Sequence, residues 1–344
     1  MIRRFHHSEF DLPRLLELKK DPITVVLPAR EVADTIGPIV ERLRGLDPLI
    51  DQILVVDADS SDGTADVAAR AGAEVHSEAL LVPEVGQVLG KGDAMWRAIG
   101  AVRGDIVAYL DADTRDFSPH FALGMLGPLL AEPRVQFVKA FFRRPYLSAD
   151  GAEMPLDGGR VTELTARPLL SAFFPELAAF VQPLAGEAAM RRGLLERMPF
   201  ATGYAVETAM LLHARDALGG TTGMAQVDLD VRLNSHQPLR DLAPMAYAVL
   251  GVILERLRDE GRLRDGHTPP LQTADGGLVQ VEVVERPPFA TLRAAAEWPS
   301  GASTRTSTAR CSARAGRSSA PPTATSRCSP GERSRRATGP AWRS

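Results

Sequence analysis

Between residues 23 and 115, short apolar runs alternate with segments whose apolar residues recur at helical spacing. Strands that alternate with helices form βαβ units, in which right-handed crossovers join parallel strands. The pattern therefore predicts an α/β fold with a Rossmann-like, mostly parallel sheet. The predicted strands are 23–29, 52–58, 73–78 and 105–113, and the predicted helices are 34–46, 63–73 and 90–102.

The chain beyond this region predicts a second half and a tail. Residues 135–144 suit one more strand, whereas residues 155–262 are richer in helical runs such as 164–181 and 206–218. We expect a first half at 1–150 and a helix-rich second half at 151–295, which together line one pocket. After about residue 300 the sequence is mostly Arg, Ser, Ala, Thr and Pro, so 296–344 is expected to be a disordered basic tail.

Composition restricts the class of protein. No stretch approaches the roughly 20 apolar residues that span a bilayer, and the first residues lack the apolar segment of a signal peptide, so we expect a cytoplasmic protein without a membrane partner. The only cysteines are Cys311 and Cys328, so a metal ion in the body would have oxygen or imidazole ligands. The abrupt change of composition in the tail is more typical of out-of-frame translation than of a binding arm, and we expect no nucleic-acid partner.

Polar motifs follow three of the predicted strands: PAREVA, DADSSDGT and DADT. In parallel sheets, ligands bind beyond the carboxyl ends of the strands, so these loops should converge on one crevice. Lys91 lies between two glycines at a predicted helix start, where an ammonium and free N–H groups favour phosphate. The candidates for binding a nucleotide are Pro28, Ala29, Arg30, Glu31, Asp57, Asp59, Ser60, Lys91 and Gly92, although Ser60 to Thr64 also fit a helix cap.

Asp111-Ala112-Asp113 places two carboxylates one residue apart at the end of a buried strand. Two explanations stay open from the residues alone. The pair is either a solvated corner or the ligand of a divalent cation, which would remove the repulsion between the two charges.

Motifs from both halves resemble a known family. LPAREVADTIGPIV, VVDADSSDGTADVA, GKGDAMWRA and YLDADT look like the nucleotide-sugar half of a GT-A glycosyltransferase. GGRVTELTARPLL, PLAGEAAMRR, GYAVETAML and DVRLNSHQPL further resemble the glucosyl-3-phosphoglycerate and mannosyl-3-phosphoglycerate synthases of glycosyltransferase family 81. The likeness runs from about residue 5 to residue 262 and leaves out the tail.

The resemblance implies a retaining transferase that moves a hexose from UDP-glucose or GDP-mannose to 3-phosphoglycerate, for the synthesis of glucosylglycerate or mannosylglycerate as compatible solutes. It implies a donor half at 1–150, an acceptor half at 151–295 and a homodimer. Asp113 would bind Mg²⁺ or Mn²⁺, with Asp111 and Ala112 beside the donor. The resemblance does not distinguish the two donors.

The resemblance also assigns the acceptor site. An anionic acceptor needs cations within an acidic body, and Arg160 can bind an anion through two hydrogen bonds. Where the family pattern has a metal-binding His two residues after Arg232, this chain has Asn234, and its histidine is His236. His236 is the preferred additional metal ligand, Glu207 and Glu187 would lie near the sugar, and the Leu184 carbonyl would face the acceptor hydroxyl. The acceptor residues are Gly159, Arg160, Val161, Thr162, Arg232 and Asn234, and the catalytic residues are Asp113, Leu184 and Glu207.

Two other functions compete with this hypothesis. A nucleotidyltransferase also places a carboxylate and a lysine beside a nucleotide, but PAREVADT is not the Gly-rich phosphate loop that such an enzyme would normally carry. The other is a non-catalytic module that binds sugar nucleotides, and the residues that argue against it are Asp111, Asp113, Lys91, Arg160 and Arg232.

Overall fold

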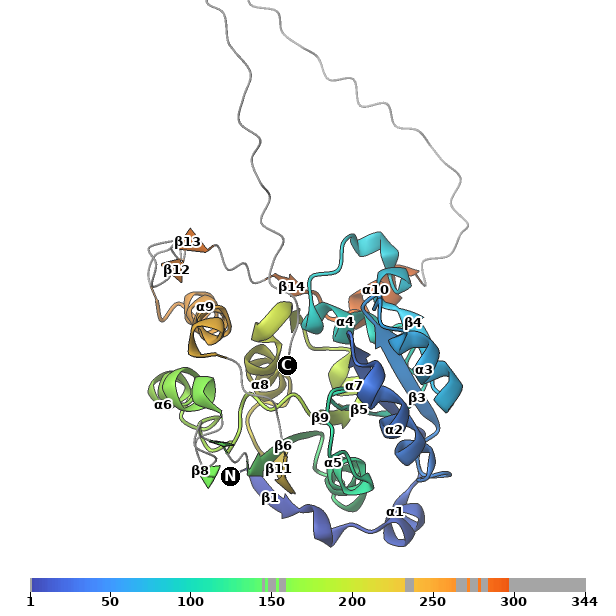
Figure 1. Ribbon diagram of the computed structural model, residues 1–344. Coiled ribbons are helices and arrows are strands. Elements are labelled where there is room, and N and C mark those ends of the chain that lie inside the picture. The colour runs from blue at the N-terminus through green and yellow to red at the C-terminus, as the bar shows by residue number, and fades with distance from the viewer. Residues whose placement is uncertain are drawn as a thin grey trace, which may run out of the picture.

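The computed structural model describes residues 2–143, 146–147, 153–154, 159–232, 238–263, 271–272, 278–279 and 284–296. An eight-stranded sheet runs through the body (Figure 1), and all of its neighbouring strands are parallel except β9, which is antiparallel to both of its neighbours. The predicted α/β fold with a mostly parallel sheet is confirmed. In spatial order the strands are β1 (Arg3–His6), β11 (Met224–Val231), β6 (Phe137–Arg143), β9 (Ala188–Arg191), β5 (Ile106–Tyr109), β2 (Ile23–Ala29), β3 (Gln52–Asp57) and β4 (Glu74–Ser77).

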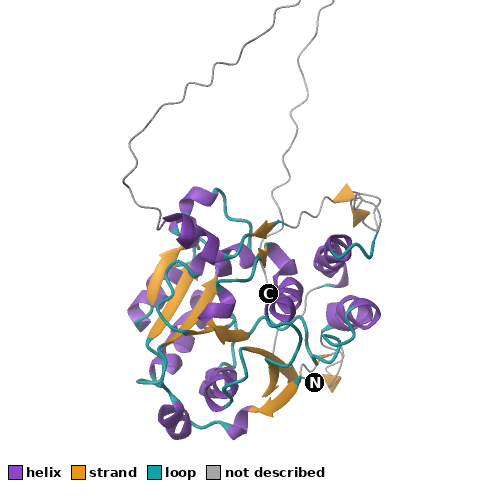
Figure 2. Ribbon diagram, turned by 180° about the vertical axis from the view of Figure 1, so that it is seen from behind, coloured by secondary structure: helices purple, strands orange, loops and turns teal. Residues whose placement is uncertain are grey.

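Helices cover both faces of this sheet (Figure 2). Helices α1 (Leu12–Leu18), α2 (Ala33–Arg44), α3 (Thr64–Ala71) and α5 (Pro119–Ala131) bury their apolar residues in one core cluster. Helices α4 (Lys91–Ala98), α6 (Arg167–Phe173), α8 (Val206–Ala217) and α9 (Ala243–Asp259) contribute to the other, and α6 and α9 lie on the outer side of α8. Strands β2 and β5 carry apolar side chains on both faces, because each face of the sheet packs against one of the two core clusters.

The second half differs from the sequence-based prediction in two places. The helical run expected at 164–181 begins with a π-helical turn, η4 (Thr162–Ala166), and ends with α6 at Phe173. Pro175 explains the end, because a proline disfavours helical backbone at the residue before it. The second half also supplies β9 and β11, which complete the sheet of the first half. The division into halves at residue 150 therefore stays a prediction about function.

The described C-terminal segment packs on the body. The indole Nε1 of Trp96 donates a hydrogen bond to the carbonyl of Pro287 at 2.9 Å, and the ring of Phe289 packs edge-on against Trp96. Arg286 donates to the fully buried carboxylate of Asp93 at 2.8 and 3.0 Å. Residues 284–296 therefore belong to the folded body, and the rest of the tail predicted at 296–344 lies outside the described residues.

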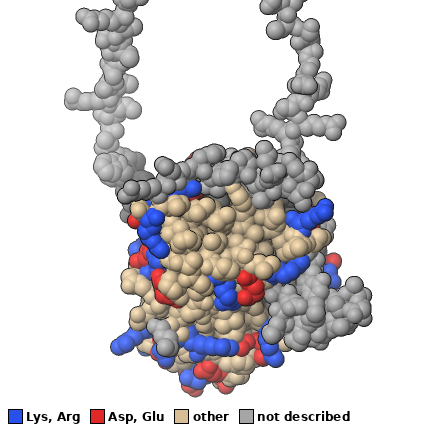
Figure 3. Space-filling view, turned by 90° about the vertical axis from the view of Figure 1, so that its left-hand side faces the viewer, with Lys and Arg blue, Asp and Glu red and all other residues tan. Residues whose placement is uncertain are grey.

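The face in Figure 3 carries mixed positive and negative side chains around a broad uncharged area. Within the described ranges, no helix is long and apolar enough to cross a membrane. The short elements are η1 (His7–Glu9), η2 (Glu78–Leu80), η3 (Pro83–Val85), η5 (Gly203–Ala205), η6 (Leu239–Leu242), α7 (Arg192–Leu195), α10 (Phe289–Ala296) and three strand pairs: β7 (Tyr146–Leu147) with β8 (Glu153–Met154), β10 (Phe200–Ala201) with β14 (Glu285–Arg286), and β12 (Leu271–Gln272) with β13 (Leu278–Val279).

Candidate active site

Six charged side chains meet beyond the carboxyl end of β5, and we call them the site cluster. Lys91 is the first residue of α4, and Glu207 lies in the first turn of α8. The Lys91 ammonium donates to Asp111 Oδ1 at 2.7 Å and lies 3.5 Å from Glu207 Oε1. The motifs assigned Lys91 and Asp111 to the donor, and the resemblance placed Glu207 near the sugar; the structure brings the three side chains together. The cluster consists of Lys91, Asp111, Asp113, Glu187, Glu207 and Arg232.

Arg232 joins the acidic members of the cluster. Its side chain is 1% exposed, and its guanidinium lies 2.9 Å from Asp111 Oδ2 and 3.3 Å from Asp113 Oδ1. It also donates to Glu187, whose side chain is equally buried. The structure therefore places Arg232 among three carboxylates, and its contact with an acceptor stays a prediction.

A glycine allows Asp111 to occupy this position. A Cβ atom on Gly186 would lie 2.4 Å from both carboxylate oxygens of Asp111, which is closer than real Cβ atoms approach other atoms. Any other residue at 186 would push the carboxylate away from Lys91 and Arg232. Gly186 precedes Glu187 in the PLAGEAA motif, so that motif supplies both the space and one of the acids.

Burial and neighbouring charges act in opposite directions on the cluster. Burial alone would raise the pKa of Asp111, but Lys91 and Arg232 lower it well below its usual range. Burial lowers the pKa of Lys91, but Asp111 and Glu207 together raise it above its usual range. For Asp113, burial and the charge of Asp111 together raise the pKa. The protein thus compensates the charge of Asp113 less than that of Asp111.

These properties suit a divalent cation at Asp113. The side chain is 24% exposed, the most accessible of the carboxylates in the cluster, and carboxylate oxygens are the hard ligands that Mg²⁺ and Mn²⁺ prefer. A cation there would relieve the repulsion from Asp111. The predicted further ligands, His236 and Asn234, lie outside the described residues.

Another group of possible metal ligands, His6, His7 and Asp230, is explained by hydrogen bonds. The backbone N–H of Ser8 donates to His6 Nδ1 at 3.2 Å, which leaves the proton of a neutral ring on Nε2, facing Asp230 at 3.4 Å. His7 Nε2 lies 2.6 Å from the same carboxylate, and Arg143 donates to it at 2.9 Å. The carboxylate is therefore satisfied without a metal.

The predicted donor loops are bonded to each other. The Glu31 backbone N–H donates to the Ser60 hydroxyl at 2.9 Å, and the Ser61 N–H donates to the Glu31 carboxylate at 2.8 Å. Glu31 and Asp59 hold left-handed backbone angles, with φ of 51° and 53°, which is common where a loop is shaped for a ligand. Within the cap suggested for Ser60 to Thr64, Asp62 accepts from the backbone N–H of Thr64, the first residue of α3, at 2.9 Å, whereas the Ser60 hydroxyl bonds to Glu31.

Most of the other residues predicted to bind the donor are buried or have no polar side chain. Asp57 is buried, its Oδ2 accepts from the Ser60 N–H at 2.9 Å, and its Oδ1 is enclosed and has no hydrogen-bond partner among the described residues. Ala29 and Ala112 are buried, and a Cβ on Gly92 would lie 2.0 Å from the Ala201 carbonyl oxygen. Gly92 thus lets α4 pack closely on β10. Pro28 is half-buried and Arg30 is exposed.

The predicted acceptor loop leads into the π-helical turn. Gly159 has φ of 78°, a backbone angle that favours glycine, and its carbonyl accepts from the Glu163 N–H at 3.1 Å. Val161 and Thr162 are buried, and Arg160 is half-buried. Leu184 is also half-buried, in the segment that leads to Gly186.

Sequence reasoning missed two ionisable residues near the site. Lys139 in β6 is buried, and the charges that act on it include Glu207, Lys91 and Glu187. Its signal was a lone lysine inside the apolar run VQFVKAFF. Glu78 lies after β4 near the donor loop, where burial and then Asp59 raise its pKa to about 7.

Comparisons with known proteins agree with this geometry. Residues 24–154 match the family model described as Glycosyl transferase family 2. The glucosyl-3-phosphoglycerate synthase of Petrotoga mobilis is 39% identical over 308 residues, which cover 84% of this chain and 94% of the relative.

Solved structures are similar over the same length. The mannosyl-3-phosphoglycerate synthase from Rubrobacter xylanophilus is 48% identical, with a TM-score of 0.76 over 84% of this chain and 96% of that one. The glucosyl-3-phosphoglycerate synthase from Mycobacterium tuberculosis, crystallised with Mn²⁺, UDP-glucose and phosphoglyceric acid, is 37% identical, with a TM-score of 0.74 over 85% and 99% of the two chains. Another structure of that enzyme contains Mg²⁺ and UDP. The chain belongs to the glucosyl- and mannosyl-3-phosphoglycerate synthase family of GT-A glycosyltransferases.

Proposed function

We propose that this protein transfers a hexose from UDP-glucose or GDP-mannose to the hydroxyl of 3-phosphoglycerate, with retention of the anomeric configuration. One observation carries the proposal. Lys91, at the start of a helix, and the Asp111 and Asp113 carboxylates meet at the edge of the sheet where ligands of parallel sheets bind. Membership of this family indicates 3-phosphoglycerate as the acceptor and restricts the donor to UDP-glucose or GDP-mannose.

Charge development explains the need for this site. Cleavage of the bond between the sugar C1 and the phosphate oxygen leaves a nucleoside diphosphate with added negative charge. Asp113 would hold Mg²⁺ or Mn²⁺, which acts as a Lewis acid that stabilises this charge. Lys91 would turn from Asp111 to the diphosphate, with the N–H groups at the start of α4 adding to the attraction. Asp57, at the end of β3, and Asp59, in the loop that follows, would accept from the nucleoside.

The acceptor hydroxyl would approach the sugar C1 from the same face as the departing diphosphate, as retention of configuration without a covalent intermediate requires. Arg160 would bind one anionic group of 3-phosphoglycerate, and the backbone at Gly159 and Val161 would approach it closely, together with Thr162. Glu207 would hold sugar hydroxyls, and the Leu184 carbonyl would accept from the attacking hydroxyl. The proton of that hydroxyl would pass to the leaving phosphate oxygen, so no carboxylate has to form a covalent bond to the sugar.

A donor panel tests the proposal. The full-length protein is mixed with Mn²⁺, 3-phosphoglycerate and either UDP-glucose or GDP-mannose, and the release of UDP or GDP is measured together with the new glycoside. Release that depends on 3-phosphoglycerate supports the proposal and identifies the donor. Absence of release with both donors refutes it, and pyrophosphate release from a nucleoside triphosphate and a sugar phosphate would instead indicate a nucleotidyltransferase.

The proposal includes a homodimer in the cytoplasm. Closed twofold assembly is the commonest state of soluble oligomeric enzymes. Light scattering after size exclusion gives the mass directly, and a monomer of about 37 kDa would refute the dimer.

A further inference from the structure

Lys139 is a buried lysine to which the proposed function assigns no role. Its side chain is 1% exposed, and within the described part of the chain its ammonium nitrogen has no hydrogen-bond partner. An ammonium can donate three hydrogen bonds, and burying one without a partner is unfavourable. A lysine kept under these conditions points to a use for its charge.

The strand directs Lys139 toward the site. Side chains alternate along β6, so Lys139 faces the same side as Phe137, which packs in the core cluster that includes residues of α4 and α8. Its neighbours in register on the adjacent strands are Ala188 of β9 and Gln226 of β11, and neither is charged. The charges that act on its ammonium are Glu207 of α8, Lys91 of α4, Glu187 before β9 and Asp111 after β5. All four belong to the site cluster.

The site cluster alone is unbalanced. Its four carboxylates face two cations, and both cations are already engaged: Lys91 by Asp111 and Glu207, and Arg232 by three carboxylates. The proposed function requires Lys91 to turn toward the donor diphosphate. Glu207 then loses the cation that lies 3.5 Å away.

We infer that Lys139 is a positioning residue, whose buried ammonium is the counterion that keeps Glu207 and Glu187 ionised and in place while Lys91 binds the donor diphosphate. The inference rests on the proposed function. Lys139 acts through these two carboxylates and not on the substrate, because its ammonium nitrogen is enclosed by the protein.

The charge of Lys139 should disappear within an accessible pH range. Burial lowers the pKa of Lys139 to about 8, although Glu207 raises it in part. The pKa of Lys91 lies above its usual range, so Lys91 keeps its charge at that pH. A loss of rate as the pH rises through 8 would therefore come from Lys139.

Lys139→Met and Lys139→Arg test the role in the full-length enzyme. We expect Lys139→Met to lower kcat by about 10-fold or more at neutral pH. Loss of a residue that holds a metal ligand in place has an effect of this size in other enzymes. Its melting temperature should change little, because the substitution removes the cost of burying an ammonium together with its attraction to Glu207 and Glu187, and keeps an apolar side chain of similar length. The wild-type rate should fall as the pH rises through 8, and Lys139→Met should show no such fall. Lys139→Arg, which keeps its charge at every pH, should retain more activity than Lys139→Met and also show no fall.

A second measurement needs no substrate. The native pKa of Lys139 is about 8, and an unfolded chain has a lysine pKa of about 10.4. Between these values the unfolded state binds more protons, so the wild type should gain stability relative to Lys139→Met as the pH rises from 8 toward 10. Below pH 8 both states are protonated, and the difference should not change.

Three results would overturn the inference. One is Lys139→Met with the wild-type rate and the wild-type decline near pH 8. Another is an unfolding free-energy difference that stays constant from pH 8 to about 10. The third is a lower melting temperature with an equal loss of activity in both variants, which would indicate a packing role. A wild type without turnover refutes the proposed function as well, whereas an active wild type matched by Lys139→Met refutes the role of Lys139 alone.

Discussion

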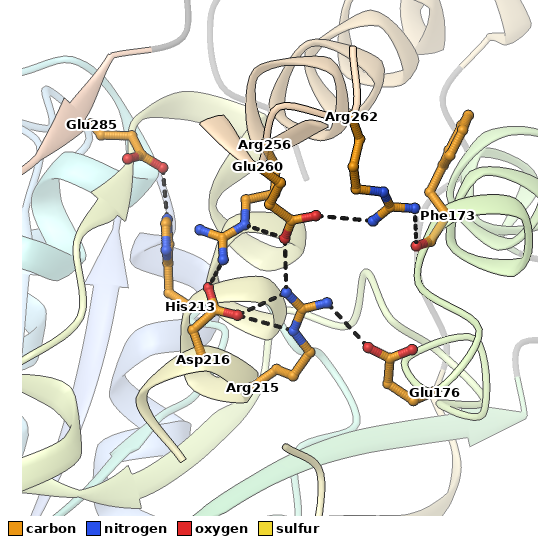
Figure 4. Close-up of polar contacts among 9 residues, drawn as sticks. All are labelled: Phe173, Glu176, His213, Arg215, Asp216, Arg256, Glu260, Arg262 and Glu285. Atoms are coloured by element: carbon orange, nitrogen blue, oxygen red, sulfur yellow. Dashed lines mark hydrogen bonds and ion pairs between the residues drawn. The ribbon is translucent and has the colours of Figure 1, made fainter. Parts of the chain in front are cut away.

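Two networks of arginines and carboxylates in this molecule share their chemistry and differ in burial. In the site cluster, Arg232 and Glu187 are each 1% exposed. In the surface network (Figure 4), side-chain exposure runs from 15% at Arg215 to 44% at Arg262, whereas in the site cluster no side chain exceeds the 24% of Asp113. The surface network joins α8 and α9 to the end of α6 through Glu176, Arg215, Asp216, Arg256, Glu260 and Arg262.

The difference in burial decides what each network can do. Exposed ion pairs contribute about 0 to 1 kcal/mol each, because water competes for both charges and salt screens them. Buried carboxylates keep their charge only through specific partners, so losing a partner is felt in full. We therefore expect substitutions in the site cluster to change activity strongly. Substitutions in the surface network should change only slightly the stability of the predicted acceptor half.

The largest effect should follow from Arg232→Met. The substitution leaves Asp111, Asp113 and Glu187 without their shared cation, and breaking a buried pair in this way typically costs about 3 to 5 kcal/mol. Chemical denaturation should show this loss of unfolding free energy, and turnover should be lost with it. Arg232→Lys, which keeps the charge, should lose less. A loss of unfolding free energy under about 1 kcal/mol would mean that the buried ion pairs of Arg232 contribute no more than exposed ion pairs do.

Asp113→Asn should separate activity from stability. The amide keeps the shape of the side chain and removes the repulsion from Asp111, so the melting temperature should not fall. Because the amide cannot neutralise a divalent cation, kcat should fall by roughly 100-fold or more.

EDTA gives the matching control for Asp113→Asn. It should abolish wild-type turnover, and Mg²⁺ or Mn²⁺ should restore it. Full activity of Asp113→Asn, or of the wild type in EDTA, would reject the metal role of Asp113.

Arg160→Ala should have a smaller and more selective effect. The substitution removes a charge-assisted hydrogen bond to an anion, worth about 1.5 to 3 kcal/mol, so the KM for 3-phosphoglycerate should rise by about 10- to 100-fold. The KM for the nucleotide sugar should change little in initial-rate measurements with each substrate varied. Equal rises for both substrates would show that Arg160 supports the structure of the site rather than the acceptor.

The order of elements in the first half could be predicted from the sequence because apolar runs such as β2 and β5 alternate with segments of helical periodicity. The strand predicted at 23–29 is β2, Ile23–Ala29, without a shift. In the second half, β9 could not be predicted, because the four residues Ala188–Arg191 show no strand pattern and owe their conformation to β5 and β6 on either side.

The site shows the same limit. Lys91, Asp111 and Asp113 could be expected to meet, because each follows a strand or begins a helix where the parallel strands end, whereas only the family resemblance placed Glu207 there. The need for Gly186 could not be read from the sequence, since it arises from the approach of Asp111 across the fold. Lys139 was missed because a lysine inside a strand shows no partner until the neighbouring strands are in place.

The smallest effect should follow from Asp216→Asn in the surface network. The Asp216 carboxylate accepts from Arg215 at 2.7 Å and from Arg256, but its side chain is 32% exposed. We expect a loss of about 0.2 to 1 kcal/mol in the free energy of unfolding at low salt, and a smaller loss in concentrated NaCl.

Asp216→Asn also tests whether the two networks are independent. Glu207 of the site cluster and Asp216 of the surface network lie in the same helix, α8, near its opposite ends. If burial separates their roles, kcat and both KM values should stay at the wild-type level in Asp216→Asn. A clear drop in kcat, with a loss of unfolding free energy still below about 1 kcal/mol, would mean that a change at the exposed end of α8 shifts Glu207 at the other end. The two networks would then not be independent.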